Sequence, residues 1–507
     1  MPSPKLPSFA LEEQREVFFS SAQTSRAVHA AVRAGRARRL ARGLYTRDTQ
    51  RPLESIARQH WLIIAAGYFP GAVLVDRTAF DFGPAEDGSV TLAGSQRRDV
   101  ELPGLRLRIR EGAGCLDGDL RWMGEEIYMS SRPRAFLENL RPSRRRRSVA
   151  RTLSRLELEE KLDEYAAGRQ ADLNRLRDSA RPIATKLGAQ REFALLDELI
   201  GAMYGTRPGK LRSRRGRARA EGFPYDGQRM LRFEQLHGHL IATALPALEA
   251  NARHELSTFA FFESYFSNFI EGTEFTLEEA ERIVFEGVIP RQRPKDAHDI
   301  LGNYRVLADR HERQRAPASA DELIDVLKTQ HAGMMRERPE VGPGQWKTEP
   351  NRAGATYFVD PRLVEGTLRE GFRFYDSLPS GFARACFAMF LVSEVHPFAD
   401  GNGRAARVLL NSELTAADQQ RVIVPTASRE DYLYGLRGMT HNANASSLVT
   451  VIRALQQKSH EIDFSSRRAA ELGLRRQRAF EESDPQPRPS VPRATRIARR
   501  PPSRNGR

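Results

Sequence analysis

The sequence predicts a multi-domain protein with a mixed α/β N-terminal region, a helical middle segment and a mainly helical C-terminal half that carries one β-hairpin. The chain has 507 residues, more than one hydrophobic core usually organises. Two arginine-rich segments contain few apolar residues, so they bury too little to offset the entropy of ordering. We therefore expect these parts: 1–140 mixed α/β, 141–204 helical, 205–224 a basic linker, 225–463 the mainly helical domain and 464–507 a disordered basic tail.

Short periodic segments define the α/β region. Alternating apolar residues and turn residues predict helices at 26–35 and 53–69, a hairpin at 38–46, and strands at 72–75, 90–92 and 105–109. In the middle segment, 152–204 is helical because apolar residues recur at helical spacing, as at Leu153, Leu156, Leu158 and Leu162.

The C-terminal half reads as a series of amphipathic helices. We expect them at 229–248, 257–270, 277–285, 294–310, 320–334, 361–375, 382–395, 404–416, 429–440 and 447–461. Residues 345–359 alternate instead and contain an Asn-Arg-Ala-Gly turn, which predicts a β-hairpin on a helical body.

Charge and cysteine content limit the class of protein. The net charge of +15 and the pI near 10.1 favour an anionic partner. The two cysteines, Cys115 and Cys386, lie too far apart in sequence for a metal-binding spacing, and so few cysteines fit a reducing compartment. The longest apolar stretch, 61–75, is too short to span a bilayer. We expect a soluble, cytoplasmic protein with no membrane partner.

Residues 395–411, VHPFADGNGRAARVLLN, combine groups that suit chemistry on a phosphate. Two glycines, Gly401 and Gly403, allow the backbone to approach a ligand, and a helix then begins near Arg404. The N-terminus of that helix attracts anions, and Arg404 and Arg407 share one of its faces. His396 is a base suited to neutral pH.

Asp400, immediately before the first glycine, adds an oxygen ligand suited to Mg²⁺. One short segment therefore supplies a base, a metal ligand, an anion cradle and two cationic clamps.

The segment His396–Arg407 resembles the Fic motif, His-Pro-Phe-x-Asp/Glu-Gly-Asn-Gly-Arg-x-x-Arg, at every defining position. The resemblance covers about 228–461 and implies an all-α fold with a β-hairpin flap over the active site. It also implies a protein adenylyltransferase, in which His396 deprotonates a Tyr, Thr or Ser hydroxyl that attacks ATP. Asp400 would carry Mg²⁺. The implied ATP-binding residues are Gly401, Asn402, Gly403, Arg404 and Arg407.

Further site residues follow from the same resemblance. The flap would pair with the backbone of a target protein through Ala353, Gly354, Ala355, Thr356, Tyr357 and Phe358. Two tyrosines, Tyr432 and Tyr434, would stack near adenine, although aromatic residues on helices are usually core residues.

An inhibitory element is predicted upstream of the motif. Residues 267–272, SNFIEG, match the family's inhibitory pattern, Ser/Thr-x-x-x-Glu-Gly/Asn, on the predicted helix at 257–271. The resemblance implies that Glu271 pairs with Arg407 and occupies the site of the γ-phosphate. Ser267 would support Glu271, and Gly272 would end the helix.

The residues 24–46, TSRAVHAAVRAGRARRLARGLYT, resemble the winged-helix start of AbiEi-type antitoxins, a likeness that extends loosely over 10–110. It implies DNA contacts through Arg33, Arg36, Arg38, Arg39 and Arg42. The alternative is a solvated basic face, and the same alternative applies to Arg144–Arg147 and to the tail.

Other functions remain open at this point. The same fold would also serve de-AMPylation, phosphoryl transfer or transfer of another nucleotidyl group. A DNA-binding regulator that only senses nucleotide is a further alternative, but a sensor has no need of the base at His396. The sequence does not identify the target protein or the oligomeric state.

Overall fold

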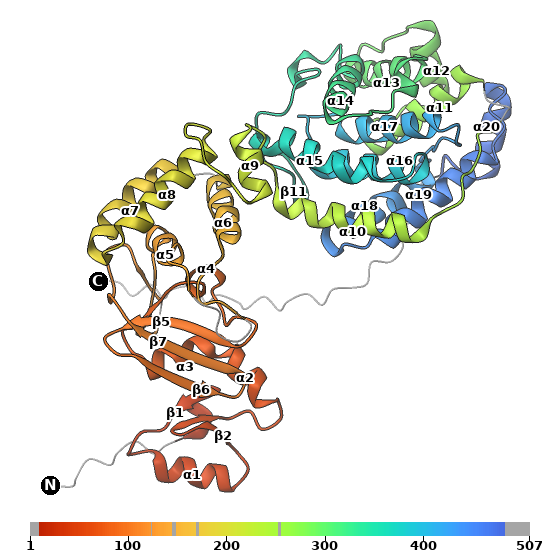
Figure 1. Cartoon of the computed structure of the whole chain (residues 1–507). Helices are drawn as coiled ribbons and strands as arrows, with labels where there is room; N and C mark the ends of the chain where they lie inside the picture. Colours follow the sequence, from red (N-terminus) through yellow and green to blue (C-terminus); the bar gives the residue numbers. More distant parts are fainter. Residues whose placement is uncertain (1–9, 123, 144–148, 169–171, 252–254, 482–507) are drawn as a thin grey trace, which may run out of the picture. The chain divides into compact units, whose positions relative to one another are not determined.

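The computed structural model describes the chain except for residues 1–9, 123, 144–148, 169–171, 252–254 and 482–507. The chain divides into two compact units, Met1–Gly222 and Phe223–Arg507 (Figure 1). Their boundary lies near the end of the segment predicted to be a linker. Each unit has its own hydrophobic core, so each is described separately.

The first unit begins with a small three-stranded sheet and one helix. The strands β1 (Val17–Phe19), β3 (Leu44–Thr46) and β2 (Arg38–Ala41) pair antiparallel in that order. The helix α1 (Ser25–Arg33) lies between β1 and β2 in sequence and buries Val28 and Ala31. The helix and the β2–β3 hairpin lie where the sequence predicts them.

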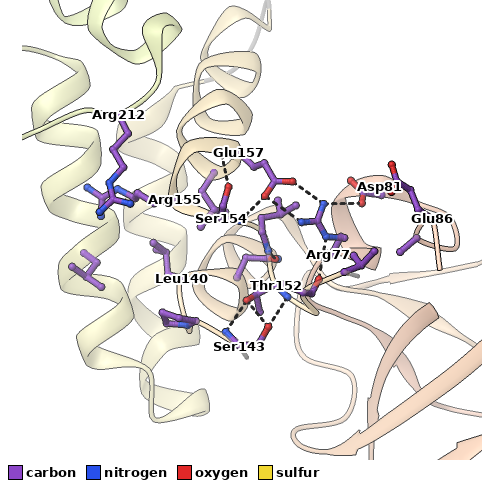
Figure 2. Close-up of a pocket in the computed structure, with 18 of the residues that line it drawn as sticks. Arg77, Asp81, Glu86, Leu140, Ser143, Thr152, Ser154, Arg155, Glu157 and Arg212 are labelled. Atoms are coloured by element: carbon purple, nitrogen blue, oxygen red, sulfur yellow. Dashed lines mark hydrogen bonds and ion pairs between the residues drawn. The ribbon is translucent and has the colours of Figure 1, made fainter. Parts of the chain in front are cut away.

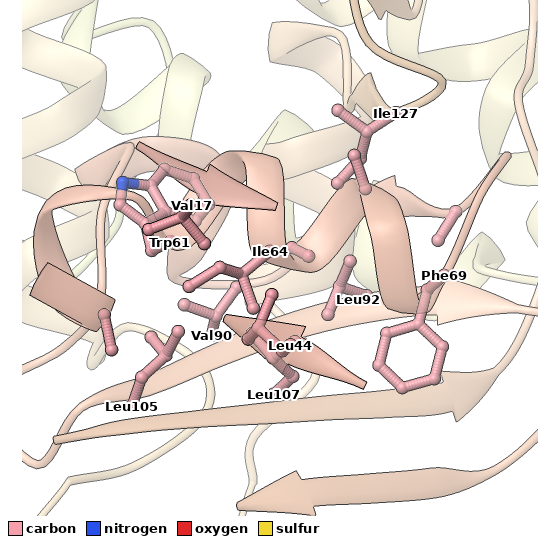
Figure 3. Close-up of a cluster of buried hydrophobic side chains, with 14 of the residues drawn as sticks. Val17, Leu44, Trp61, Ile64, Phe69, Val90, Leu92, Leu105, Leu107 and Ile127 are labelled. Carbon is pink, nitrogen blue, oxygen red and sulfur yellow. The ribbon is translucent and has the colours of Figure 1, made fainter. Parts of the chain in front are cut away.

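A six-stranded mixed sheet forms the centre of this unit. Its strand order is β6 (Arg98–Leu102), β7 (Leu105–Glu111), β5 (Ser89–Gly94), β4 (Val73–Leu74), β9 (Tyr128–Met129) and β8 (Leu120–Arg121). Along β7, residues alternate between buried leucine or isoleucine and half-buried arginine. The buried set packs with residues of α2 (Leu53–Gln59) and α3 (Trp61–Tyr68) in one core (Figure 3).

Helices complete the first unit: α4 (Thr78–Asp81), α5 (Arg132–Asn139), α6 (Arg155–Ala167), α7 (Leu173–Leu187) and α8 (Gln190–Met203). A cavity of about 1020 Å³ lies beside α6 (Figure 2). Arg77 donates to Glu157 at 2.8 Å on its wall, and the hydroxyls of Ser143 and Thr152 lie 3.0 Å apart. Leu156 is 45% exposed, although its spacing predicts a buried position.

The prediction of an unstructured linker over 205–224 is wrong in part. Residues Arg214–Ala220 form the helix α9, whose N-terminus is capped by Ser213. Two arginines of this helix, Arg215 and Arg219, donate to the buried carboxylate of Asp163 on α6 at 2.8 and 2.7 Å. Buried ion pairs therefore order a segment that has few apolar side chains.

The second unit is mainly helical. Its long helices are α10 (Gly227–Thr243), α11 (Leu256–Ile270), α12 (Leu277–Glu286), α13 (Pro294–Ala308), α14 (Ala320–Met334), α15 (Val364–Asp376), α16 (Phe382–Val395), α17 (Asn402–Ala416), α18 (Arg429–Asn442), α19 (Ala445–His460) and α20 (Arg467–Arg476). Each predicted helix is present. The predicted hairpin is β10 (Arg352–Ala353) and β11 (Thr356–Tyr357), joined at Gly354, whose φ is +58°.

The prediction of a disordered tail from residue 464 is also wrong in part. Phe464 packs at 4.7 Å, ring to ring, on Phe259 of α11, and Leu474 of α20 belongs to the same buried cluster. These few apolar residues are enough to order the segment because they cover the phenylalanine-rich helix α11. Residues 482–507, and Arg144–Arg147, lie outside the described residues.

Among the described residues, every helix is too short or too polar to cross a membrane.

The two leucines of α20 allow a test of its packing. Leu474 is 1% exposed, whereas Leu472 is 50% exposed. We expect Leu474→Ala to lower the free energy of unfolding by about 2–4 kcal/mol because it leaves a cavity in the core. Leu472→Ala should change it by less than about 0.5 kcal/mol. Urea denaturation of both variants measures the difference, and equal effects would contradict a docked α20.

Candidate functional site

The loop between α16 and α17 carries the motif that begins at His396 and has an unusual backbone. His396 caps the end of α16 in the left-handed region, with φ of 53° and ψ of 60°. A non-glycine residue in this region is strained and must be held by its surroundings. Gly401, also left-handed with φ of 77°, caps α17, which begins at Asn402 rather than at Arg404 as predicted.

Asn402 closes this loop with its side chain. Its Oδ1 accepts from the backbone N–H of Phe398 at 2.8 Å, and its Nδ2 donates to the carbonyl oxygen of Phe398 at 2.9 Å. The residue is 2% exposed. Asn402 therefore shapes the loop, and any contact with phosphate would come from its backbone.

Below the loop, Phe398 stacks on His331 of α14 with ring centroids 3.7 Å apart. Nδ1 of His331 accepts from the backbone N–H of Gly344 at 2.9 Å, so Nε2 carries the proton and donates to the carbonyl oxygen of Asp400 at 3.0 Å. Burial lowers the pKa of His331 to about 4, which keeps it neutral. Sequence reasoning missed this support, because His331 lies far from the motif in the chain.

His396 is held as a neutral base. Its ring stacks on Phe358, which follows the hairpin, with centroids 3.7 Å apart. Its Nδ1 lies 3.3 Å from the carbonyl oxygen of Ser393 and donates to it, which leaves Nε2 as the acceptor. Burial lowers the pKa of His396 to about 4, against the opposing effect of this hydrogen bond. At neutral pH the imidazole can therefore accept a proton.

Arg407 is enclosed by the end of α11. Its Nη2 donates to Oε1 of Glu271 at 2.6 Å and to the carbonyl oxygen of Ser267 at 3.0 Å. Its Nε donates to the Ser267 hydroxyl at 2.9 Å, so Ser267 holds Arg407 directly, where the sequence suggested support for Glu271. The helix ends before Gly272, whose φ is 89°, as predicted.

Glu271 is an ionised carboxylate in a partly covered position. Burial alone would raise its pKa, but the charge and hydrogen bond of Arg407 outweigh burial and lower the pKa below its usual value. The side chain of Glu271 is 34% exposed and that of Arg407 is 6% exposed. The carboxylate also packs against Gly403, where an added Cβ would collide with its Oε1.

Arg404 pairs with groups other than Glu271. Its guanidinium lies 2.9 Å from Asp299 of α13 and donates to Asn268 of α11 at 3.2 Å, and Arg404 is 2% exposed. Asp299 also pairs with Arg338 at 3.0 Å. Sequence reasoning missed Asp299 and Arg338, since nothing in their local pattern marks them. Arg404 thus links three helices.

Asp400 is the most accessible carboxylate of the loop, with a side chain that is 45% exposed. Its Oδ1 accepts from the N–H of Gly401 at 2.6 Å, and its Oδ2 lies 3.5 Å from Arg338. Within the described residues, no cluster of three or more His, Cys, Asp or Glu side chains could hold a metal. A single carboxylate does fit Mg²⁺ that arrives with a phosphate group, because Mg²⁺ keeps most of its water.

A cleft of about 550 Å³ opens between the loop, the hairpin and α18. The predicted residues that line it are His396, Gly403, Arg407, Glu271, Tyr432, Ala353, Gly354, Ala355, Thr356 and Phe358. The predicted residues outside its lining are Asp400, Gly401, Asn402, Arg404, Ser267, Gly272, Tyr357 and Tyr434.

The two predicted adenine-stacking tyrosines are separated by the geometry of α18. Tyr432 lines the cleft, is 1% exposed and lies under the guanidinium of Arg407, 5.9 Å from ring centroid to Cζ. Tyr434 is 67% exposed and does not line the cleft. Residues two apart on a helix point to nearly opposite sides, so only one of the pair can face the cleft.

Sequence reasoning also missed a stripe of α18 that lines the cleft: Arg429, Leu433, Leu436, Arg437, Thr440 and His441. The spacing of three and four residues could have revealed this stripe, because it marks one face of a helix.

Comparison with known proteins identifies the domain that carries this site. Residues 321–414 match the Fic/DOC family. The match includes α14, which supplies His331, and the motif of α16 and α17. The chain therefore contains a Fic domain.

Named relatives match less than half of this chain. The protein adenylyltransferase fic-1 of Caenorhabditis elegans is 26% identical over 212 residues, which is 39% of each chain. A Fido domain-containing protein of Dictyostelium discoideum is 29% identical over 102 residues, which is 19% of this chain and 71% of that one. The chain thus spans well under half the length of the adenylyltransferase relative.

Among solved structures, Fic-1 of C. elegans is 20% identical, with a TM-score of 0.35 over 64% of this chain and 94% of its own. A Fic domain protein from Bacteroides thetaiotaomicron is 17% identical, with a TM-score of 0.34 over 49% of this chain and 98% of its own.

The contact between Glu271 and Gly403 can be tested by a double-mutant cycle. Gly403→Ala should destabilise the protein by about 1–3 kcal/mol because its methyl group collides with the Glu271 carboxylate. In the Glu271→Gly background the same change should cost clearly less. Urea denaturation of the four proteins gives the coupling energy. Additive effects would show that the carboxylate does not lie over Gly403.

Proposed function

We propose that the protein transfers AMP from ATP to a hydroxyl group of a target protein. The observation that carries this proposal is a neutral histidine, His396, that lines the same cleft as the buried cation Arg407 beside the glycine turn. Such a pair supplies a base at one point of the cleft and a phosphate ligand at another. The Fic domain and its adenylyltransferase relatives support the same reading.

In the proposed reaction, Nε2 of His396 accepts the proton of a Tyr, Thr or Ser hydroxyl while that oxygen attacks the α-phosphate of ATP. The bond to the bridging oxygen of pyrophosphate breaks, and pyrophosphate leaves with the electron pair. Arg407 would bind the terminal phosphates. Backbone N–H groups at Asn402 and Gly403 would face the phosphate oxygens at the start of α17, whereas the N–H of Gly401 already donates to Asp400.

The accessible carboxylate of Asp400 would hold Mg²⁺, which neutralises charge on the phosphates when bound. Tyr432 would lie beside the nucleotide, whereas the exposure of Tyr434 and the buried pairing of Arg404 argue against direct contacts by these two residues.

Glu271 would act as a brake on this reaction. Its carboxylate already accepts from Arg407 and lies over Gly403, where a terminal phosphate would need to be. The Glu271 carboxylate and a terminal phosphate would repel each other at this position, so ATP would bind with its α-phosphate misaligned for attack.

The hairpin would dock the target. Its tip at Gly354 and Ala355 is exposed, Tyr357 on β11 is 61% exposed, and its strands have only two residues each, so an extended segment of a target can pair beside them. The proposed partners are therefore ATP and a protein substrate. Two free cysteines, Cys115 and Cys386, fit a cytoplasmic location.

The proposed reaction and brake are tested together with labelled ATP. We expect Glu271→Gly to raise the incorporation of AMP into lysate proteins or into the chain itself by roughly 10²-fold, because it restores alignment. His396→Ala in that background should abolish it. Glu274→Gly, an exposed glutamate three residues away, is the control and should have no effect.

Equal AMP incorporation by the wild type and by Glu271→Gly would contradict the proposed inhibition by Glu271. Release of AMP from modified protein would favour the alternative of de-AMPylation, and incorporation of label from the γ-phosphate would favour phosphoryl transfer.

A second function, DNA binding, is favoured by the surface of the first unit. The proposed winged-helix face would consist of the small sheet β1-β3-β2 and α1, and α1 has arginines but no acidic residue. Arg33 of α1, Arg36 between α1 and β2, and Arg39 and Arg42 of the β2–β3 hairpin are exposed. Arg38 is less suited, because it donates to the carbonyl oxygen of Asp48 at 2.9 Å. We propose duplex DNA as the ligand.

An electrophoretic-shift experiment tests this second function. Replacing Arg33, Arg36, Arg39 and Arg42 by alanine should abolish binding of a DNA duplex at low salt, because each arginine neutralises a phosphate. The slope of log affinity against log salt should flatten as single arginines are removed. Arg58→Ala is the control, since Arg58 donates to the carbonyl oxygen of Gly104 at 3.0 Å. If all variants shift the DNA duplex equally, the basic face does not bind DNA and is a solvated surface.

A further inference from the structure

A buried lysine lies behind the loop that carries His396. Lys347 is 4% exposed, and its ammonium group donates to Oδ1 of Asn351 at 2.7 Å and approaches the carbonyl oxygen of Val395 at 3.4 Å. Its backbone N–H donates to the carbonyl oxygen of Pro397 at 2.9 Å. In the part of the chain that the structure describes, Lys347 forms no ion pair, which is unusual for a buried cation.

Asn351, which accepts from Lys347, also contacts the loop backbone. Nδ2 of Asn351 donates to the carbonyl oxygen of Phe398 at 3.0 Å. Lys347 and Asn351 together therefore hold the backbone on both sides of His396, at 395, 397 and 398. Because His396 is left-handed, its peptide orientation depends on such outside contacts.

We propose that Lys347 is a positioning residue for His396: it fixes the strained turn through the carbonyl groups beside the imidazole and places a positive charge behind it. This inference rests on the proposed function. It adds that the segment leading into the hairpin, which would dock the target, also orients the base. Docking and base orientation are then mechanically linked, because Asn351 is adjacent to β10.

The charge of Lys347 favours the neutral form of His396. After burial, its positive charge is a further cause of the lowered pKa of His396, while Glu271 and Asp400 act in the opposite direction. Burial and the charge of Arg229 lower the pKa of Lys347 itself to about 7, and Asp360 opposes them. Near pH 4, where His396 titrates, Lys347 is therefore protonated.

Three variants of the full chain, in the Glu271→Gly background, test the proposal. Lys347→Met removes both the charge and the donor, Lys347→Arg keeps the charge, and Lys328→Met is the control. Lys328 is a matched lysine because it contacts Trp346, the residue next to Lys347, with Nζ 4.8 Å from the ring centroid. Two experiments are made on each variant: steady-state kinetics give kcat and KM for AMP transfer, and NMR with labelled histidine gives the titration midpoint of His396.

We expect Lys347→Met to lower kcat by roughly 10²-fold through misorientation, with little change in KM for ATP. The titration midpoint of His396 should move to higher pH, because the removed charge favoured the neutral imidazole. Lys347→Arg should keep the midpoint, and Lys328→Met should keep both values. A merely structural lysine would not move the midpoint.

Unchanged kcat and midpoint in Lys347→Met would overturn the proposal, as would a loss of kcat with an unchanged midpoint. Should Lys347→Met fail to fold, Lys347→Gln replaces it, since the amide keeps a donor but loses the charge. The midpoint can be measured without AMP transfer, so absence of activity in Glu271→Gly would count against the proposed function and leave this test intact.

Discussion

The site of the second unit depends on the buried guanidinium of Arg407. Three groups of α11 hold it, namely the carbonyl oxygen and hydroxyl of Ser267 and the carboxylate of Glu271. A cation this well buried requires partners, because its desolvation would otherwise be very unfavourable. The end of α11 provides them, and a bound phosphate would be the natural replacement for the carboxylate. The same contact therefore stabilises the fold and fills the position that a substrate anion would take.

A set of buried polar side chains fixes the loop between α16 and α17. Asn402 closes the loop from inside, His331 supports it from α14, and Lys347 contacts it from the segment before the hairpin. Each makes hydrogen bonds to backbone carbonyl groups, which leaves the imidazole of His396 free to accept a proton. The rigidity of the loop thus comes from neighbours that are remote in sequence, as expected for a strained turn.

Ion pairs also order parts of the molecule that composition alone assigns to disorder. The segment around α9 is mostly arginine and glycine, yet Asp163 holds Arg215 and Arg219. A window of sequence shows the unpaired charges of such a segment but not the distant carboxylate that neutralises them. The stretch after Phe464 was misjudged for a similar reason, because its few apolar residues fill a gap over the phenylalanines of α11.

The sequence by itself determined the periodic helices, the hairpin and the residue types of the His396–Arg407 segment, since these depend on spacing within a few turns. The pairing of Glu271 with Arg407 was also foreseen, through a resemblance rather than through spacing. Only the tertiary structure decided that Tyr432 and not Tyr434 faces the cleft, that Arg404 is bound to Asp299, and that Lys347 lies behind the base. Those outcomes depend on which helix faces meet, and contacts between residues far apart in the chain leave no local pattern.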